Sequence, residues 1–297
     1  VKGSASIAKF YKIPDMVVGL TIVSIGTSMP ELIVNLIASF SGESDIAVGN
    51  VFGSNIANVL LILGASAIIY PLPIVRNTLL TELPIVLVAT LLVGFLANAA
   101  VFDPALELTL SRWDGIILLI FFVFFMIYIF HLAKSGKQEE MSDGEEIELL
   151  PMWKSISFIV AGIIGLFIGG KWVVDGAVEI ARMFGLSESF IGLTIVAIGT
   201  SLPELVTSMI AAHKRNTDIA VGNIVGSNIF NLLWILGISA IINPLPFNTV
   251  SNLDIMVMIF SSVMLLLPLA FSKNNTVTRG LGVFFILSYV GYIVFLI

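Results

Sequence analysis

The chain contains the same segment twice. When the sequence is shifted by 173 positions, residues 19–73 align with residues 192–246 without a gap, and 36 of the 55 aligned residues are identical. The shared stretches include GLTIV, IGTS, PEL, DIAVGN, GSNI, ILG and PLP. Duplicated segments fold as repeated structural units that pack on one another. The chain is therefore predicted to consist of two related halves.

Both copies lie in a chain that is too apolar for a water-soluble fold. Hydrophobic residues make up 58% and charged residues only 11%, against about 25% charged residues in soluble domains. Apolar runs near the length needed to cross a bilayer, about 20 helical residues, recur along the chain. The predicted fold class is an all-α integral membrane protein, a bundle of ten helices. The expected runs are residues 1–10, 17–40, 46–70, 83–102, 113–132, 156–174, 190–212, 219–242, 255–271 and 281–297.

An acidic segment separates the halves. Residues 133–154 are rich in Glu, Asp, Gly and Ser and have no apolar period, which is typical of a solvated linker. The predicted units are a first repeat over residues 1–132 and a second repeat over residues 155–297. The register of the duplication places residues 1–10 opposite the end of the sixth run. The first helix is therefore expected to be truncated in this chain.

Five runs in each half imply that the two halves cross the membrane in opposite orientations. If the chain starts outside, most Lys and Arg residues fall in loops on the inner side, as the positive-inside rule requires. The linker is then cytoplasmic, and the protein is a multi-pass protein of the cell membrane with the lipid bilayer as its partner. Inverted repeats are typical of secondary transporters, which bind substrate between the repeats near mid-membrane. No pattern for nucleic-acid binding is present.

Each repeat carries an acidic residue inside an apolar run. Glu31 follows SIGTSMP and Glu204 follows AIGTSLP. Pro30 and Pro203 cannot donate a backbone hydrogen bond, so nearby carbonyls lose their partners. In lipid, such carbonyls are tolerated only where they line a cavity or bind something. A carboxylate at mid-membrane costs about 3 kcal/mol on insertion scales, so we interpret Glu31 and Glu204 as cation ligands.

The next run of each repeat adds neutral oxygen ligands. Ser54 and Asn58 are four residues apart and share one helix face, as do Ser227 and Asn231. Each pair can present a hydroxyl and an amide oxygen to the same site. For the neighbouring amides, hydrogen bonding between helices is the alternative interpretation. These neighbours are Asn50, Asn55, Asn223 and Asn228.

The chemistry of these ligands restricts the ion. The set contains carboxylate, hydroxyl, amide and carbonyl oxygens; the chain has no cysteine, and neither histidine lies in the motifs. Calcium accepts about six to eight such oxygens in flexible geometry, whereas magnesium requires a stricter octahedron. Sodium accepts the same oxygens as calcium. Ca²⁺ and Na⁺ are therefore the ions expected as substrates, and no cofactor is expected. Enzyme activity is not expected either, because no nucleophile and histidine have catalytic spacing.

The repeated motifs resemble those of a known family. GTSMPEL with GNVFGSNIAN, repeated as GTSLPEL with GNIVGSNIFN, is similar to the alpha-repeats of the sodium/calcium exchangers in the cation/calcium antiporter superfamily. The resemblance is to a prokaryotic-type minimal exchanger without a large regulatory domain. It implies exchange of Ca²⁺ for Na⁺ by alternating access, and we expect a functional monomer. The ligands expected on this basis are Glu31, Glu204, Thr27, Thr200, Ser28, Ser201, Ser54, Ser227, Asn58 and Asn231, with the backbone carbonyls of Ser24 and Ala197.

One position departs from part of that family. Some members, including potassium-dependent ones, have an aspartate where this chain has Asn231, so potassium dependence is not expected. GTSMPE in place of the GNATE typical of proton-driven relatives favours sodium coupling. Two alternatives stay open at this point. A proton-coupled cation exchanger would use the same scaffold, and a calcium-permeable channel fits less well because channels build such filters from symmetric oligomers.

Overall fold

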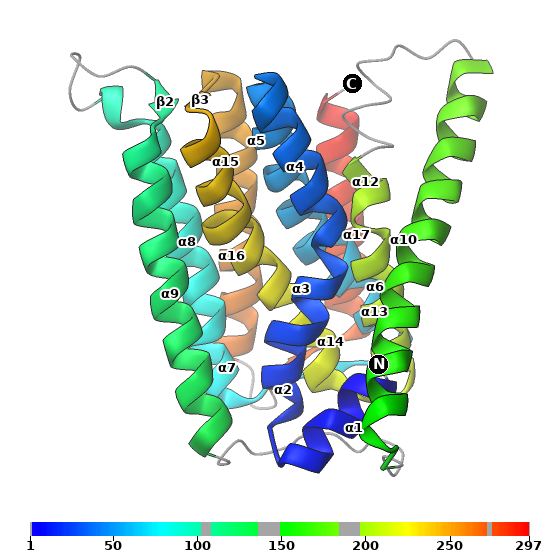
Figure 1. Cartoon of the computed structure of the whole chain (residues 1–297). Helices are drawn as coiled ribbons and strands as arrows, with labels where there is room; N and C mark the ends of the chain where they lie inside the picture. The colour runs from blue at the N-terminus through cyan, green and yellow to red at the C-terminus, as the bar shows by residue number, and fades with distance from the viewer. Residues whose placement is uncertain (1, 102–107, 136–148, 184–196, 272–274, 297) are drawn as a thin grey trace.

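The computed structural model describes residues 2–101, 108–135, 149–183, 197–271 and 275–296. These residues form a bundle of long helices that run roughly side by side (Figure 1). The all-helical membrane bundle predicted from the sequence is confirmed. The predicted run over residues 190–212 begins outside the described residues, so the count of ten helices stays a prediction.

The first half runs from α1 to α9, with two π-helical segments inside long helices. Its elements are α1 (Lys2–Tyr11), α2 (Asp15–Val18), the π-helix η1 (Gly19–Val23), α3 (Ser24–Thr27), α4 (Met29–Ser41), α5 (Ser44–Ile56), the π-helix η2 (Ala57–Leu63), α6 (Gly64–Ile69), β1 (Leu72–Pro73), α7 (Arg76–Leu80), α8 (Glu82–Ala97), the 3₁₀-helix η3 (Ala99–Val101), β2 (Thr109–Leu110) and α9 (Arg112–Ser135).

The second half repeats this order where it is described. Its elements are α10 (Met152–Met183), α12 (Ala197–Thr200), α13 (Leu202–His213), α14 (Thr217–Ile229), the π-helix η5 (Phe230–Ile235), α15 (Leu236–Ile242), β3 (Leu245–Pro246), the 3₁₀-helix η6 (Thr249–Ser251), α16 (Asn252–Phe271), β4 (Thr276–Val277) and α17 (Arg279–Leu296). The predicted run over residues 156–174 is longer than expected, because α10 extends to Met183.

Length and composition identify the membrane-crossing helices. Within the described residues, six helical stretches are long and apolar enough to cross a bilayer, and a seventh is added if the bent pair on either side of Ser28 counts as one span. In an 18-residue apolar segment of each span, 72% of the residues are buried in α5–η2–α6 and 83% in α14–η5–α15, against 17% in α9 and in α17. The two former stretches are therefore the centre of the bundle, and α9 and α17 present most of their surface to lipid.

Short β-strands join the two repeats at their loops. β1 pairs antiparallel with β4, and β2 pairs antiparallel with β3, so each pair takes one strand from each half. Each pair includes the PLP motif of one repeat, with Leu72 opposite Val277 and Leu110 opposite Leu245. Figure 1 shows β2 and β3 together at one end of the bundle. These strands are not predictable from the sequence, since two residues are too few to show a period.

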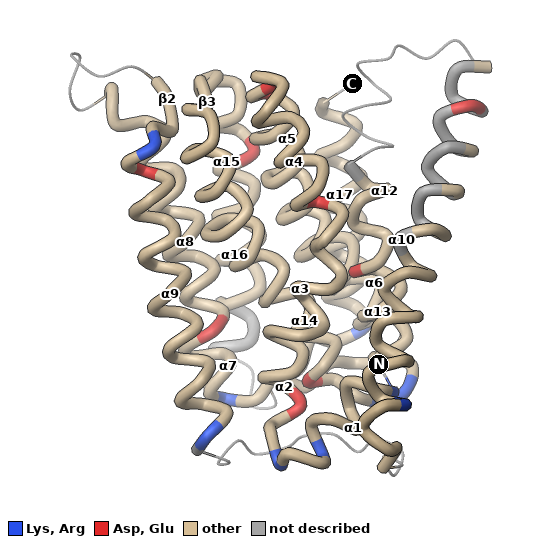
Figure 2. Tube along the Cα trace, in the orientation of Figure 1, with Lys and Arg blue, Asp and Glu red and all other residues tan. Residues whose placement is uncertain are grey.

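Charge is distributed unevenly along the bundle axis. Figure 2 shows most described Lys and Arg residues at one end, near α1, α7 and the start of α10. Positive residues concentrate on the cytoplasmic side of membrane proteins. This basic end is therefore the one that the sequence analysis assigns to the cytoplasm.

A tyrosine bound to an acid attaches each lipid-facing helix to the bundle. On α9, the Tyr128 hydroxyl donates to Glu82 Oε1 at the start of α8 at 2.6 Å. On α17, the Tyr292 hydroxyl donates to Asp254 Oδ1 at the start of α16 at 2.7 Å. The Glu82 side chain is fully buried. Its carboxylate therefore depends on Tyr128 to offset the loss of water.

We expect Tyr128→Phe to lower the free energy of unfolding by about 1–3 kcal/mol, because the variant leaves the buried acid without that donor. Unfolding of the purified protein in detergent, followed by circular dichroism, measures the change. Tyr11→Phe is the matched control, since Tyr11 is 59% exposed. Equal stability of the two variants would contradict a stabilising role for the Tyr128 hydroxyl.

Candidate ion-binding site

A break in the second span places Glu31. The axes of Asp15–Thr27 and Met29–Ser41 differ by 48°, and Pro30 occupies the first turn of α4. Because Pro30 has no N–H, it cannot bond the carbonyl four residues earlier, as the sequence analysis predicted. The break puts Glu31 in the first turn of α4, where the helix N-terminus favours negative charge.

The second repeat has the same local structure. α12 ends at Thr200, α13 begins at Leu202, and Pro203 again stands in the first turn. Glu204 lies in that first turn. The identical GTS and PE residues thus produce the same helix break in both repeats. Each break places one acid in the interior.

Both carboxylates are buried and each is held from the opposite repeat. Glu31 and Glu204 are each 1% exposed. The Ser201 hydroxyl donates to Glu31 Oε1 at 3.0 Å, and the Ser28 hydroxyl donates to Glu204 Oε1 at 2.8 Å. The two serines are equivalent residues of the two repeats. Each acid therefore lies against a residue of the opposite repeat, and a shared ion site between the repeats stays a prediction.

Two more serines complete this arrangement. Ser54 lies 3.4 Å from Glu31 Oε1 and 3.1 Å from the Ser201 hydroxyl. Ser227 lies 3.4 Å from Glu204 Oε1 and 3.0 Å from the Ser28 hydroxyl. Each carboxylate is thus approached by one serine from its own repeat and one from the other. The result is two matching groups of oxygen atoms.

Several buried atoms at the site have no hydrogen-bond partner. Within the described part of the chain, this holds for Oε2 of Glu31 and of Glu204 and for Oδ1 of Asn58 and of Asn231. A buried polar atom without a partner costs about 1–3 kcal/mol, and more when it is charged. Among the described residues, no three His, Cys, Asp or Glu side chains lie together so that they could hold a metal ion. A cation here would therefore be held by two acids together with neutral oxygens.

The threonines and the first amide of each motif bond between helices. The Thr27 hydroxyl donates to Asn223 Oδ1 at 3.0 Å, and the Thr200 hydroxyl donates to Asn50 Oδ1 at 3.3 Å. Asn50 in turn donates to Asn35 Oδ1 at 2.7 Å. Asn50 and Asn223 therefore follow the alternative interpretation, bonding between helices.

Asn58 and Asn231 lie in the π-helical segments of the two central spans. Asn58 belongs to η2 and Asn231 to η5, and both side chains are buried. Asn58 Nδ2 donates to Asn228 Oδ1 at 2.9 Å, whereas neither polar atom of Asn231 has a partner among the described residues. π-Helical turns occur often at functional sites. These turns were not predicted, since no residue pattern marks a π-turn.

The two backbone carbonyls expected as ligands are those of Ser24 and Ala197. The Ser24 carbonyl accepts the N–H of Ser28 at 2.9 Å and has the Thr27 hydroxyl at 3.4 Å. Ala197 begins α12, and its side chain lies outside the described residues. A ligand role for either carbonyl stays a prediction.

A family model described as sodium/calcium exchanger protein matches residues 1–131 and 154–297. The chain belongs to this family. As an exchanger-family protein it has relatives of similar length in bacteria and archaea. It is 32% identical to the sodium/calcium exchanger MaX1 of Methanosarcina acetivorans, over 100% of this chain and 93% of MaX1. It is 37% identical to the inner membrane protein YrbG of Escherichia coli (strain K12), over 95% of this chain and 86% of YrbG.

Solved structures support the same assignment. This chain superimposes on a structure of the sodium-calcium exchanger NCX_Mj soaked with Na⁺ and Ca²⁺, with a TM-score of 0.78 and 33% sequence identity. The superposition covers 98% of the exchanger and 90% of NCX_Mj. The fold and family inferred from the repeated motifs are therefore confirmed, and the exchanger is a multi-pass membrane protein.

Proposed function

We propose that this chain is a secondary active antiporter that exchanges Ca²⁺ for Na⁺ across the membrane. The observation that carries the proposal is the pair of buried carboxylates, each bonded by a serine of the opposite repeat. Because both carboxylates are buried, an ion can reach this site only when the surrounding helices move. Family membership and the named exchangers MaX1 and NCX_Mj support the choice of ions.

Charge balance explains why the two ions compete. Two ionised glutamates carry the charge that one Ca²⁺ neutralises, and the surrounding hydroxyl and amide oxygens provide the further ligands that calcium needs. Several Na⁺ ions can neutralise the same carboxylates. The unloaded site retains two buried negative charges, which are costly away from water. The loaded site is neutral, so loading permits the switch between the two sides.

The proposed ligands are those that the motifs indicate. The carboxylates bind the divalent ion. The hydroxyl and amide oxygens are the ligands that make the individual Na⁺ sites different from one another. Their places in the structure favour this assignment, because the described side chains are buried, apart from that of Thr200, which is partly buried. The proposed set is Glu31, Glu204, Ser28, Ser201, Ser54, Ser227, Thr27, Thr200, Asn58 and Asn231, with the carbonyls of Ser24 and Ala197.

Flux measurements in proteoliposomes test the function. Vesicles loaded with Na⁺ and diluted into Na⁺-free buffer should accumulate radioactive Ca²⁺, whereas equal gradients of K⁺ or H⁺ should leave uptake at the level of protein-free vesicles. Uptake driven by a pH gradient without Na⁺ would replace sodium coupling with proton coupling. Calcium entry that ignores Na⁺ on the opposite side would indicate a channel.

A further inference from the structure

Two helices from opposite repeats, α2 and α14, begin next to each other at the basic end of the bundle (Figure 1). The Asn216 side chain donates from Nδ2 to Asp15 Oδ2 at 2.9 Å. Asn216 precedes α14, and Asp15 is the first residue of α2. Both side chains are buried, with exposed fractions of 7% and 6%. A buried hydrogen bond therefore joins the two repeats at the end that the sequence analysis assigns to the cytoplasm.

Behind this bond the two helices are in backbone contact. A Cβ added at Gly222 would lie 2.8 Å from the Met16 carbonyl oxygen, and one added at Gly226 would lie 2.8 Å from the Leu20 carbonyl oxygen. The contacting residues are four apart on both helices. α2 and η1 therefore run parallel to α14, and their shared boundary, which we call the seam, is closed at each of these contacts.

The seam leads to the proposed ion site. Further along the same two chain segments, the Ser28 hydroxyl lies 3.0 Å from the Ser227 hydroxyl and donates to Glu204 at 2.8 Å. An ion that entered between α2 and α14 from the basic end would thus arrive at one of the two carboxylates. Opening the seam would connect the site with the cytoplasm.

The turns that carry the bond have unusual backbone conformations. Asn216 Oδ1 caps α14 by accepting the Ile219 N–H at 3.2 Å, while Nδ2 bonds Asp15. Arg215, just before Asn216, has a φ of 59°, and Lys12, in the turn before α2, has a φ of 54°. Left-handed backbone is unfavourable for such residues and persists where surrounding contacts impose it. Both turns are therefore held in strained conformations beside the bond.

The first repeat cannot form the same bond. The shift of 173 positions makes Glu43 the equivalent of Asn216. Glu43 is exposed, its side chain does not cap α5, and a carboxylate has no N–H to donate. At Gly49, the equivalent of Gly222, an added Cβ would meet no described atom within 4 Å outside its own helix backbone and chain neighbours. Among the described residues, the bond and the tight contact thus occur together at one end only.

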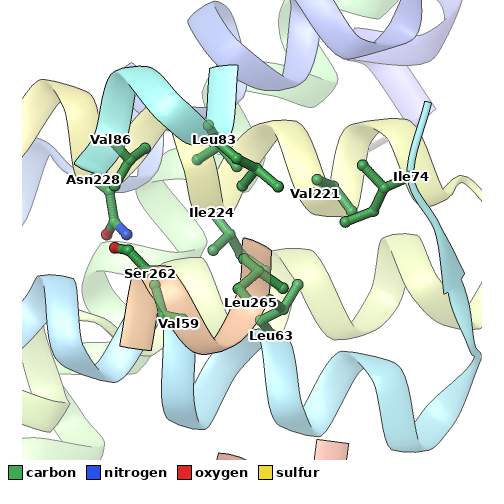
Figure 3. A pocket seen from close by; sticks show the side chains of 11 residues that line it. Val59, Leu63, Ile74, Leu83, Val86, Val221, Ile224, Asn228, Ser262 and Leu265 are labelled. Atoms are coloured by element: carbon green, nitrogen blue, oxygen red, sulfur yellow. The ribbon is translucent and has the colours of Figure 1, made fainter. Parts of the chain in front are cut away.

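Another face of α14 is packed less tightly. Its Val221 and Ile224 line a narrow cavity with a mainly apolar wall. Figure 3 shows both side chains at this cavity, with Leu63 and Leu265 of neighbouring helices. Atoms that border a void lose the contacts of a close-packed core. Packing on this face therefore does little to hold α14 against η1, and the bond at the start of α14 acts where the helices must stay together.

We propose that the hydrogen bond from Asn216 to Asp15 is a latch that keeps the basic end of the protein closed between α2 and α14. The inference rests on the proposed exchange function, because a carrier must open to each side in turn. The seam opens to the cytoplasm when the bond breaks and η1 separates from α14. Because the first repeat has no such bond, the latch favours the state that is closed at the basic end.

Thiol labelling measures how often the seam opens. The chain has no cysteine, so Met16→Cys introduces a single thiol on α2 at a side chain that is 1% exposed. In detergent with Na⁺, a charged maleimide reacts with this thiol when the seam opens. Asn216→Asp keeps an oxygen to cap α14 but has no N–H for Asp15, so it should raise the labelling rate about tenfold. An unchanged rate would overturn the proposal.

A second substitution tests whether the hydrogen bond itself is responsible. Adding Asp15→Asn to Asn216→Asp exchanges donor and acceptor, so the labelling rate should return to within about twofold of its starting value. A rate that stays high would refute the latch. Glu43→Gln is the matched control at the equivalent position and should leave the rate unchanged; an increase equal to that of Asn216→Asp would contradict the proposal.

A thiol elsewhere in the core separates opening of the seam from general loosening. Val93 of α8 is fully buried, and Val93→Cys should stay unlabelled when Asn216→Asp is added. Equal acceleration at Val93→Cys and at Met16→Cys would refute the latch, because the whole bundle would then have loosened. The assay measures opening rather than transport, so its failure would leave the flux test of exchange unaffected.

Discussion

Glu31→Gln and Glu204→Gln should each reduce sodium-driven Ca²⁺ uptake at least about 100-fold. Each variant keeps the shape of the side chain and removes one of the two charges that balance the divalent ion. An uncompensated charge in the protein interior costs about 3–5 kcal/mol, and each 1.4 kcal/mol is a factor of ten in binding. Uptake into proteoliposomes at matched protein density measures the loss.

The control for these variants is Glu82→Gln. Glu82 is also a fully buried acid, but it bonds Tyr128 rather than the serines of the proposed site. Glutamine retains an oxygen that accepts from Tyr128, so this variant should keep transport near the wild-type rate. Uptake within tenfold of wild type in both Glu31→Gln and Glu204→Gln would remove these residues from the ligand set.

Gly222→Ala should destabilise the protein strongly, whereas Gly49→Ala should not. A Cβ added at Gly222 would lie 2.8 Å from the Met16 carbonyl oxygen and 3.0 Å from Gly19 Cα. These are backbone atoms, so η1 and α14 would have to separate. Overpacking of this kind costs about 1–3 kcal/mol. We expect the ratio of unfolded to folded protein to rise about 5- to 30-fold.

Gly49 is the equivalent glycine of the first repeat and provides the comparison. Apart from its own helix backbone and chain neighbours, no described atom lies within 4 Å of a Cβ added there. Alanine favours a helix over glycine by about 1 kcal/mol. Thermal unfolding in detergent compares the two variants. Equal destabilisation would mean that the tight contact at Gly222 has a counterpart at Gly49, and the two repeats would then pack alike.

The candidate site was largely predictable because its signals are local. A proline that breaks a helix and an acid inside an apolar run are each expensive in lipid, so their presence indicates a binding role. The register of the duplication then paired Glu31 with Glu204 without any structural information. Among the spans that the structure describes in full, the limits were also predictable to within a few residues, except for α10, because hydropathy responds directly to the bilayer.

The hydrogen bonds across the repeats were not predictable. Nothing in the order of residues indicates that Ser28 bonds Glu204 and Ser201 bonds Glu31, since helix packing alone brings these side chains together. The π-turns of η2 and η5 were missed for the same reason. Their extra residue per turn is stabilised by neighbouring helices, and apolar residues such as those around Asn58 suit an α-helix equally well.

Apolar length, helix breaks and internal identity are properties of the chain, so the amino-acid order alone predicts a membrane-embedded duplicate with two acids in its interior. How equivalent residues differ depends on tertiary packing. Asn58 bonds Asn228, while Asn231 and Asn55 have no such bond among the described residues. Two nearly identical motifs carry no information about which copy makes a bond, because that depends on how the repeats pack against each other.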